Sequence, residues 1–415
     1  MRTLTEQARR QFYPDGAYLQ ASHDYQRTAA DAYVAAIAAL RWAGEEVPEA
    51  WIAAVDRSVT FLHAHQNPGE GDLPNSGAND GSMFLVLSSC LFSDFRPSLQ
   101  AASVAARGER LYAQGKWDEP AIWLFGDSAL QGSRARRTRA SVSFESGYHL
   151  LRAENEDTFA TFRCGPVRER FGQLDMLHVD LYWHGHPIAV DGGSYCYADE
   201  KMHHHLHGTA SHNTVTVDGR DQMVQQRRFS SVYLTPARLL RYEARNGRRM
   251  AIGEHLGFER YDGAVVHRRA VLLAKTGLCV VIDQLRGTGQ HDVRVHWLCA
   301  PYPFDAEPSR GRLLLQTPEG PFSVSVLDGH GAPVPGDVCG GCGHPPRGWF
   351  SRRYLEKQAA PSLAVSARTV MPATFVSVLA PGVPSVSVIG RRWSVANAGD
   401  TELIFDLGIE GIVVP

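Results

Sequence analysis

The sequence predicts an α+β protein with two domains, a helical domain over residues 1–130 and a large antiparallel β-sandwich over residues 131–415. Its 415 residues exceed the usual size of one hydrophobic core. Apolar residues recur at three- and four-residue steps in the first part of the chain, and they alternate with polar residues in the second part. Many short strands without helices between them are typical of an antiparallel sandwich.

Two sets of apolar residues at helical spacing predict the first two helices, and the alanines between them favour helix. The sets are Tyr33, Ile37 and Leu40, then Trp51, Val55, Val59 and Leu62. Gly44 and Pro48 mark the turn between these helices. Residues 67–82, NPGEGDLPNSGANDGS, are too rich in Gly, Pro and Asn for either element and predict a long loop.

Two further helices are expected in the first domain. The longest apolar run, MFLVLSSCLF over residues 83–92, is interpreted as a buried helix, and another helix is predicted over residues 97–114. The apolar run has about half of the ~18–20 residues that a bilayer-spanning helix needs. The sequence therefore predicts no transmembrane segment.

In the second domain, short β-branched or aromatic runs separated by Gly, Pro, Asp and Asn predict the strands. The runs are VDLYW (179–183), TVTV (214–217), LCVVIDQL (278–285), VRVHWL (293–298), RLLLQT (312–317), FSVSVL (322–327), LAVSA (363–367), TFVSVLA (374–380), SVSVI (385–389) and ELIFDL (402–407).

Composition narrows the function. With a net charge of −2 and 21% charged residues, the chain has no general attraction to nucleic acid or anionic membranes. The basic run GSRARRTRA (132–140) is interpreted as a solvated loop between the domains. The N-terminus lacks the apolar core of a signal peptide. Seven cysteines argue against a disulfide framework, and Cys339-Gly-Gly-Cys342 predicts either a glycine-rich loop with incidental thiols or a local disulfide.

Residues suited to chemistry gather in three clusters, at 11–27, 171–197 and 203–223. In the first cluster, a Pro-Asp-Gly turn leads into His23, Tyr25 and Arg27 at the start of a helix. In the second, strand alternation from residue 177 would place His178, Asp180 and Tyr182 on one face and apolar residues on the other.

The second and third clusters also contain candidate metal ligands. Asp175 and Asp191 bracket the expected strand, and His212 precedes the next one. Two carboxylates and an imidazole suit a divalent cation such as zinc. The same three side chains would equally cap turns or form hydrogen bonds inside a sheet, and their spacing leaves both interpretations open.

The third cluster begins with four histidines in five residues: His203, His204, His205 and His207. They would form either a mobile surface loop that binds metal adventitiously or one wall of a site for acidic sugars, whose carboxylates and hydroxyls imidazoles can bind.

At these clusters the sequence resembles the heparinase II/III family of polysaccharide lyases, including its alginate- and oligoalginate-lyase relatives. The segments that carry the resemblance are EQARRQFYPDGAYLQASHDYQR (6–27), FGQLDMLHVDLYWHGHPIAVDGGSYCY (171–197), TASHNTVTVDGRDQM (209–223) and GWFSRRYLEKQAAPSL (348–363). The resemblance implies an α/α toroid, here partial, joined to the β-sandwich, with acidic polysaccharide or oligosaccharide bound in the cleft between them.

The family's reaction is β-elimination at a uronic acid, and the resemblance assigns roles to individual residues. The implied catalytic residues are Tyr25, His178 and Tyr195. The implied substrate contacts are His23, Arg27, Gln173, His205, His207 and Asn213. Relatives with zinc in the β domain imply one structural zinc ion, with Asp175, Asp191 and His212 as the matching ligands.

Two departures from the family pattern bear on activity. The family's glycine-histidine pair before the central strand is Gly172-Gln173 here, and an amide cannot transfer a proton at ordinary pH. His178 is the nearest imidazole that could replace it. The resemblance also implies an Asn or Asn-His motif upstream of the tyrosine, which neutralises the substrate carboxylate. We expect the given sequence to lack that motif and to hold about a third of the usual toroid.

Two hypotheses of function follow. One is a lyase that cleaves acidic, uronate-containing polysaccharide in the periplasm or cell envelope. The other is a non-catalytic polysaccharide-binding or matrix-assembly accessory with a degenerate site. Tyr25 and the β-domain motifs favour the first hypothesis, and Gln173 and the missing upstream Asn motif favour the second. A shortened toroid would also leave apolar helix faces exposed, which predicts self-association.

Overall fold

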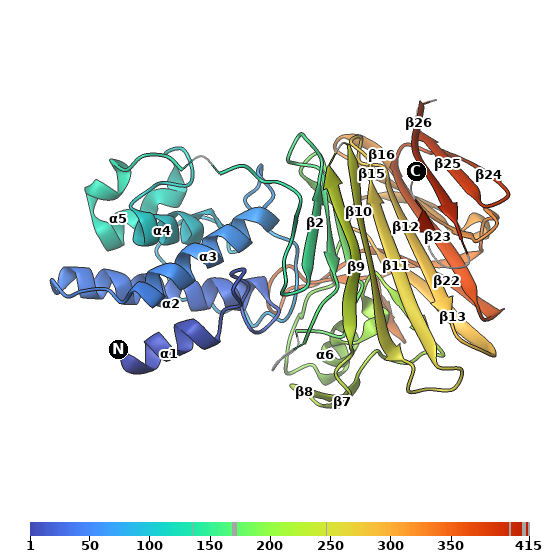
Figure 1. Ribbon diagram of the computed structural model, residues 1–415, viewed down its shortest axis with the longest axis horizontal. Helices are drawn as coiled ribbons and strands as arrows, with labels where there is room; N and C mark the ends of the chain where they lie inside the picture. The colour runs from blue at the N-terminus through green and yellow to red at the C-terminus, as the bar shows by residue number, and fades with distance from the viewer. Residues whose placement is uncertain (136, 168–171, 246, 398–399, 409–411, 414–415) are drawn as a thin grey trace.

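The computed structural model describes residues 1–135, 137–167, 172–245, 247–397, 400–408 and 412–413. Residue 136 of the expected basic loop and residue 171 of the second cluster lie outside this description. The helices gather at the end of the molecule that carries the N-terminus, and the sheets form the other end (Figure 1). The last helical turn before the sheets ends at Leu130, and the first strand begins at Val142.

Five helices make up the N-terminal region: α1 (Arg2–Arg10), α2 (His23–Trp42), α3 (Glu49–His65), α4 (Arg96–Arg107) and α5 (Glu119–Phe125), with 3₁₀ turns at Lys116–Asp118 and Asp127–Leu130. Ser22 caps α2, because its Oγ accepts a hydrogen bond from the Tyr25 backbone N–H at 3.2 Å. The apolar sets predicted for α2 and α3 are confirmed as core, with only Leu40 partly exposed. The helix expected at 97–114 ends earlier, at Gly108, whose φ of 69° stops it.

The predicted buried helix at 83–92 is wrong. This segment is irregular, and the side chains of Phe84, Val86 and Leu91 are 54%, 73% and 72% exposed. Its backbone polar groups are bound by side chains instead of by a helical ladder: Arg27 donates to the Phe92 carbonyl, and Glu119 accepts from the Ser89 N–H at 2.6 Å. A short apolar run whose backbone is satisfied in this way gains little from helix formation.

All named strand pairs are antiparallel, in three larger sheets and a C-terminal one. The five-stranded sheet runs in sequence order: β1 (Val142–Ser143), β2 (Tyr148–Arg152), β3 (Phe159–Arg163), β4 (Val179–Trp183) and β5 (His186–Ala189). The eight-stranded sheet has the order β14 (Phe304–Glu307), β15 (Arg312–Thr317), β16 (Gly320–Asp328), β23 (Ala373–Pro381), β12 (Cys279–Arg286), β11 (Val265–Leu273), β10 (Arg248–Phe258) and β9 (Ala237–Arg245).

The remaining strands complete the β region. A four-stranded sheet has the order β17 (Gly336–Gly340), β22 (Pro361–Val370), β13 (Gln290–Leu298) and β6 (Val215–Val217), and the C-terminal sheet consists of β24 (Ser385–Ile389), β25 (Arg392–Asn397), β26 (Asp400–Leu407) and β27 (Ile412–Val413). Three two-stranded sheets pair β7 (Val224–Arg227) with β8 (Ser230–Val232), β18 (Cys342–Gly343) with β19 (Pro346–Arg347), and β20 (Trp349–Phe350) with β21 (Gln358–Ala359). The helix α6 (Glu200–His207) and 3₁₀ turns at Thr209–Ser211 and Pro308–Arg310 connect strands of the β region.

The main core lies between the eight-stranded sheet and the two sheets that face it. It joins residues of β4 and β13, such as Leu181 and Trp297, to residues of β12 and β16, such as Val281 and Val324. A second core packs the other face of the eight-stranded sheet against the C-terminal sheet around Trp393. The eight-stranded sheet is therefore covered on both faces, which is the layered antiparallel arrangement that the alternating runs predict.

Every predicted strand run lies wholly or largely within an observed strand. The sequence interpretation missed β2, β3 and the outer strands β9 to β11, whose arginines and histidines interrupt the alternation. Within the described part of the chain, no helix combines the length and apolar character that a membrane span requires. Cys339 and Cys342 form a disulfide, which is one of the two alternatives left open for them.

Candidate functional site

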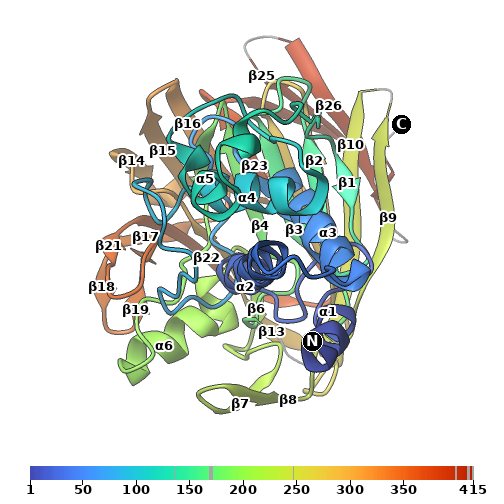
Figure 2. The same cartoon turned by 90° about the vertical axis from the view of Figure 1, so that its left-hand side faces the viewer.

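The helices and the sheets meet where the loop predicted at 67–82 reaches the β region; Figure 2 views this arrangement from the helical end. Asn75 donates through Nδ2 to the Ser351 carbonyl at 2.8 Å, and Arg352 donates to Asp72 at 2.9 Å. Both contacts join segments more than 270 residues apart in sequence (separations of 276 and 280). They hold the loop, and with it the start of α2, against the sheets.

Tyr25, in the first turn of α2, reaches across this boundary. Its hydroxyl lies 2.7 Å from the hydroxyl of Tyr197, in the segment between β5 and α6. Tyr25 also lines a cavity of about 470 Å³ beside Thr28 and Phe84. Burial raises the pKa of the Tyr25 phenol above its ordinary range, and the hydrogen bond with Tyr197 raises it further. Tyr25 therefore keeps its proton at neutral pH.

Aromatic rings surround the tyrosine pair on the β side. Tyr197 makes edge contacts with His203 of α6 at 5.3 Å, with Phe229 at 5.1 Å and with Tyr354 at 5.6 Å between ring centroids. The Tyr354 hydroxyl accepts a hydrogen bond from the Tyr197 backbone N–H at 3.1 Å. The hydroxyl of Tyr25 thus points at a wall of rings contributed by three different segments of the β region.

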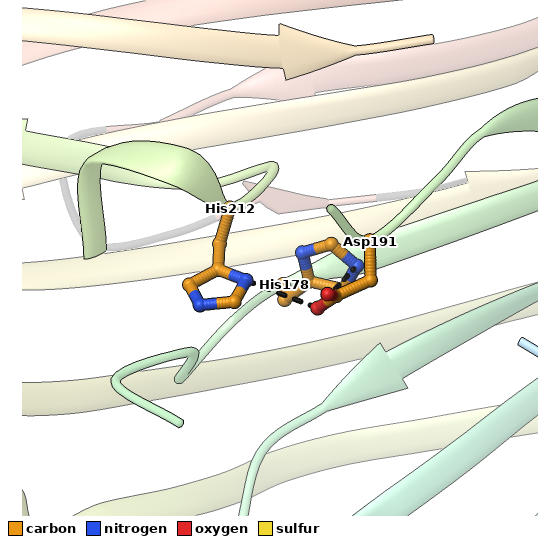
Figure 3. A group of neighbouring side chains, drawn as sticks. All are labelled: His178, Asp191 and His212. Atoms are coloured by element: carbon orange, nitrogen blue, oxygen red, sulfur yellow. Dashed lines mark hydrogen bonds and ion pairs between the residues drawn. The ribbon is translucent and has the colours of Figure 1, made fainter. Parts of the chain in front are cut away.

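A second polar group, formed by His178, Asp191 and His212, lies inside the β region (Figure 3). His212 Nδ1 is 3.0 Å and His178 Nε2 is 3.9 Å from Asp191 Oδ2, and one ligand atom of each residue lies within 4.8 Å of the others. The group is buried, and the two imidazoles lower the pKa of Asp191 although burial alone would raise it. Two imidazole nitrogens and one carboxylate are a donor set that zinc accepts, so these side chains fit a metal ion.

A buried ion pair beneath this group holds its backbone. Arg269 of β11 donates to both oxygens of Asp283 in β12, at 2.7 and 3.0 Å. The same guanidinium donates to the carbonyls of Leu177 and Asn213, which adjoin His178 and His212. One fully buried arginine therefore fixes the two segments that carry the histidines.

The expected metal set requires a correction at Asp175. Asp191 and His212 are in contact, but the third member of the group is His178 and not Asp175. The backbone turns at Leu177, whose φ is 65°, and the His178 N–H donates to the Asp175 carbonyl at 3.0 Å. This turn points the His178 ring at Asp191. Burial raises the pKa of Asp175, which interacts electrostatically with Arg163 and with His212, Asp191 and His178; it lies beside the group without being one of the three converging side chains.

The expectation that His178 replaces the missing acid/base is also contradicted by its contacts. Its Nδ1 accepts the Asn213 backbone N–H at 2.9 Å, and its Nε2 faces Asp180 at 3.2 Å. The side chain is buried, so both ring nitrogens face groups inside the β region and neither faces the Tyr25–Tyr197 pair. The predicted strand faces are otherwise confirmed, because Val179 and Leu181 lie in the core while Asp180 and Tyr182 line a separate cavity of about 280 Å³.

Asn213 and Gln173 were expected to contact substrate. Asn213 has no exposed surface, and its amide binds the carbonyls of Val179 and Val190 and the Leu298 N–H. It joins strands and does not reach a ligand. Gln173 is 2% exposed and donates to the Gly193 carbonyl at 3.0 Å, while its Oε1 has no hydrogen-bond partner in the described structure.

His23 and Arg27 are likewise not available to substrate. Arg27 is fully buried, is paired with Asp24 at 2.8 Å and is stacked between the rings of Phe92 and Phe95. His23 is 3% exposed and hydrogen-bonds the Pro74 carbonyl through Nδ1 at 2.9 Å. Both residues hold the start of α2, which carries Tyr25, in place.

The histidine run is an ordered helix, α6, and not a mobile loop, because Asp199 caps it by accepting the Met202 N–H at 3.0 Å. His203 and His207 stack on each other and are buried. His205 faces the other way, with the exposed His204, into a cavity of about 630 Å³. Burial lowers the pKa of His205 to about 4 and that of His207 to about 3. The ring of His203 packs against Tyr197 and Phe229.

The expected second tyrosine was Tyr195, and the structure brings Tyr197 to Tyr25 instead. Tyr195 stacks under the ammonium of Lys357, 4.1 Å from the ring centroid. In a regular extended segment Tyr195 and Tyr197, two residues apart, would face the same side. The φ of Tyr195 is 55°, so the chain turns there and the two rings point to different partners, which no local sequence pattern indicated. Phe229 and Tyr354 were missed because nothing local in the sequence connects them to the first cluster.

Comparison with a protein-family model is consistent with this architecture: residues 136–379 match "Heparinase II/III-like, C-terminal". No curated protein matches the sequence. Solved structures do match, and they include a heparan sulfate lyase HepC mutant from Pedobacter heparinus (TM-score 0.73, 18% identity), the "Heparinase III-BT4657 gene product" (TM-score 0.71, 16% identity) and a heparinase III (TM-score 0.71, 15% identity).

Each of these three matches covers 98% of this chain. The chain spans only 61%, 61% and 62% of the lengths of those proteins, in the order named. At these identities the likeness concerns the fold, and the fold extends through the helices as well as the sheets.

Proposed function

The chain belongs to the heparinase II/III family, and from this membership we propose that it cleaves acidic, uronate-containing polysaccharide by β-elimination. The fold is that of a polysaccharide lyase-like protein. The observation that carries the proposal is the contact between Tyr25 and Tyr197 across the boundary of the helices and the sheets. It sets two phenols beside a wall of aromatic rings and an imidazole.

The chemistry needs an acid and a base. In β-elimination a base removes the proton at C5 of the uronate, the C4–C5 double bond forms, and the C4–O bond breaks as the leaving oxygen takes a proton. The Tyr25 phenol is protonated at neutral pH, so it carries the proton that the leaving oxygen needs; the raised pKa alone would make it a weaker acid, and its position supplies the catalytic effect. Tyr197 orients that hydroxyl through the 2.7 Å contact. We therefore assign Tyr25 as the general acid.

His203 is our candidate for the base. Its Nε2 donates to the Arg228 carbonyl at 2.9 Å, so the lone pair is on Nδ1. Burial lowers its pKa, which keeps the imidazole neutral near pH 7. His203 takes the role that the resemblance gave to the residue at the Gln173 position, from a different segment of the chain.

We propose that one zinc ion is held by His178, Asp191 and His212. Their donor atoms converge, and the side chains are buried and held by the Arg269–Asp283 pair. When bound, zinc would supply positive charge that neutralises Asp191 and ties β4 to the segment before β6. Its role would be to hold the polypeptide that leads to Tyr195 and Tyr197, and the elimination step does not depend on it.

We further infer that α1 to α5 are part of an α/α toroid and that the protein works in the periplasm or cell envelope, where such polymers occur. The second hypothesis, a binding accessory without turnover, is supported by one observation. Gln173, an amide, occupies the position of the expected imidazole and binds only backbone.

The test is the ultraviolet absorbance of the unsaturated product, followed with alginate, heparan sulfate, hyaluronan and bacterial exopolysaccharides. An increase with one of these polymers is expected for the lyase. If none gives product and polymer binding is retained, the accessory hypothesis replaces it.

A further inference from the structure

The hairpin formed by β7 and β8, residues 224–234, protrudes from the surface beside α6 at the lower edge of the molecule (Figures 1 and 2). Apolar side chains on it are unusually exposed for a soluble domain: Phe229 is 56% and Tyr233 is 68% exposed. We call residues 224–234 the basic hairpin, because Arg227 ends β7 and Arg228 lies in the turn that follows.

Those arginines, Arg227 and Arg228, precede Phe229 directly. Both side chains are exposed, and neither has an ion-pair partner among the described residues. Two adjacent guanidinium groups without a carboxylate repel each other and attract anions. The tip of the basic hairpin therefore combines positive charge with an open aromatic face.

The inner side of this tip packs against the aromatic rings that surround Tyr197. The Phe229 ring contacts Tyr197 at 5.1 Å and His203 at 5.8 Å between centroids, and the Arg228 carbonyl accepts from His203 Nε2. Tyr197 in turn meets Tyr25. An unbroken series of contacts thus leads from the proposed acid to the exposed half of Phe229.

We propose that the basic hairpin is a binding site for an anionic saccharide chain, next to the sugar at the reaction centre. The exposed face of Phe229 would stack on the apolar face of a pyranose ring, and Arg227 and Arg228 would bind carboxylate or sulfate groups through paired N–H donors. The proposal deepens the proposed function, since it rests on the polymer passing Tyr25, and it identifies charged groups of neighbouring sugars as part of the recognised pattern.

The chain contains a matched control. The β24–β25 hairpin, at the end of the molecule opposite the helices (Figure 1), also has an exposed apolar residue, Ile389 (79% exposed), close to two exposed arginines, Arg391 and Arg392. A double substitution there removes the same charge far from Tyr25. The comparison separates a local site from a general effect of net charge.

The experiment measures binding of heparan sulfate and alginate by affinity electrophoresis at several salt concentrations, so that it does not require turnover. Arg227→Ala with Arg228→Ala is expected to weaken binding by about 10-fold or more and to flatten its salt dependence. Phe229→Ala is expected to weaken it by about 5-fold, with Phe229→Leu as a second variant that keeps apolar packing on Tyr197. Arg391→Ala with Arg392→Ala is expected to stay within about twofold of the wild type.

Turnover, where present, adds a second measurement: the variant with Arg227→Ala and Arg228→Ala is expected to raise KM while kcat stays within about threefold. If no polymer is cleaved but the hairpin variants lose binding, the proposed lyase activity fails and the binding site stands. Unchanged binding in the hairpin variants, equal loss in the control pair, or tighter binding of a DNA oligonucleotide than of a saccharide of equal charge would overturn the proposal.

Discussion

Tyr25 shows how the surroundings of a single residue change the pKa of its side chain. A solvated phenol would be an ordinary weak acid, but here burial and Tyr197 raise its pKa. We expect Tyr25→Phe to reduce lyase activity by ~10²–10⁴-fold, because the leaving oxygen would lose its proton donor. The ring and its packing remain, so the melting temperature should change little. The measurement is the rate of product absorbance.

Tyr242→Phe is the control for Tyr25→Phe. It removes a tyrosine hydroxyl that hydrogen-bonds the Leu150 carbonyl at 2.8 Å in the β region, away from the tyrosine pair. Its activity should equal that of the wild type. Full activity in Tyr25→Phe would end the assignment of this residue as the acid.

Asp31, on α2, provides a prediction about stability against pH. Burial raises its pKa to about 7, and one oxygen accepts from Ser98 at 3.1 Å. In the unfolded chain the same carboxyl has a pKa of ~3.9. The folded state therefore binds the extra proton between about pH 4 and 7, so the stability due to Asp31 is fully present below pH 4 and is lost as pH rises towards 7.

Replacing Asp31 with Asn should remove this loss. We expect Asp31→Asn to be more stable than the wild type at pH 8, by roughly 4 kcal/mol at most, and to show little difference at pH 4. Asp56→Asn is the opposite case, because Arg107 and Arg137 lower the pKa of Asp56, and it should be less stable at neutral pH. Urea unfolding at both pH values measures the free energy of unfolding of each protein. If this free energy changes equally between pH 4 and pH 8 in the wild type and in Asp31→Asn, the prediction is contradicted.

At the scale of elements, the His178–Asp191–His212 group draws together the start of β4, the end of β5 and the turn before β6. If zinc holds these segments, chelation should lower the melting temperature of the wild type by several degrees, by mass action on the folded state. His212→Ala should bind less than a tenth of a molar equivalent of zinc and should show no response to chelator. The measurement is metal analysis of untagged protein with thermal unfolding.

The control for the metal prediction is His186→Ala. This histidine is on β5, is partly exposed and lies 3.7 Å from Glu319, outside the group. It should bind zinc as the wild type does. A wild-type protein that contains no zinc and does not respond to chelation would rule the metal out, and the three side chains would then be a hydrogen-bonded network inside the sheets.

At the scale of the whole molecule, large apolar side chains remain exposed on the helical region. Trp42 is 68% and Trp123 is 71% exposed, and Val86 and Leu91 exceed 70%. Exposed apolar surface of this kind drives association. We expect sedimentation velocity to show a dimer or larger species whose fraction rises with concentration, and we expect Trp42→Gln with Trp123→Gln to reduce it. A monodisperse monomer at high concentration would contradict the prediction.

By itself, the sequence determined that a helical region precedes a strand-rich region, and it determined the family, because helical and strand periodicities are local and the motif segments are contiguous. It also located the three polar clusters. It could not determine which cluster members meet. Tyr25 and Tyr197 are 172 residues apart, and the chain turns at Tyr195, where φ is 55°, so that Tyr197 and not Tyr195 meets Tyr25.

Tertiary structure also decided which polar side chains are buried and bind other groups of the protein instead of a ligand. The resemblance predicted that Arg27 and Asn213 contact substrate. In the fold, the Arg27 guanidinium packs between two phenylalanine rings, and the Asn213 amide donates to two backbone carbonyls. His178 took the position expected for Asp175 because the chain turns at Leu177, where φ is 65° and the carbonyl is bound by Arg269, 92 residues away. Periodicity shows where an element begins and ends, whereas the direction of a polar side chain after a turn depends on partners that only the folded chain brings close.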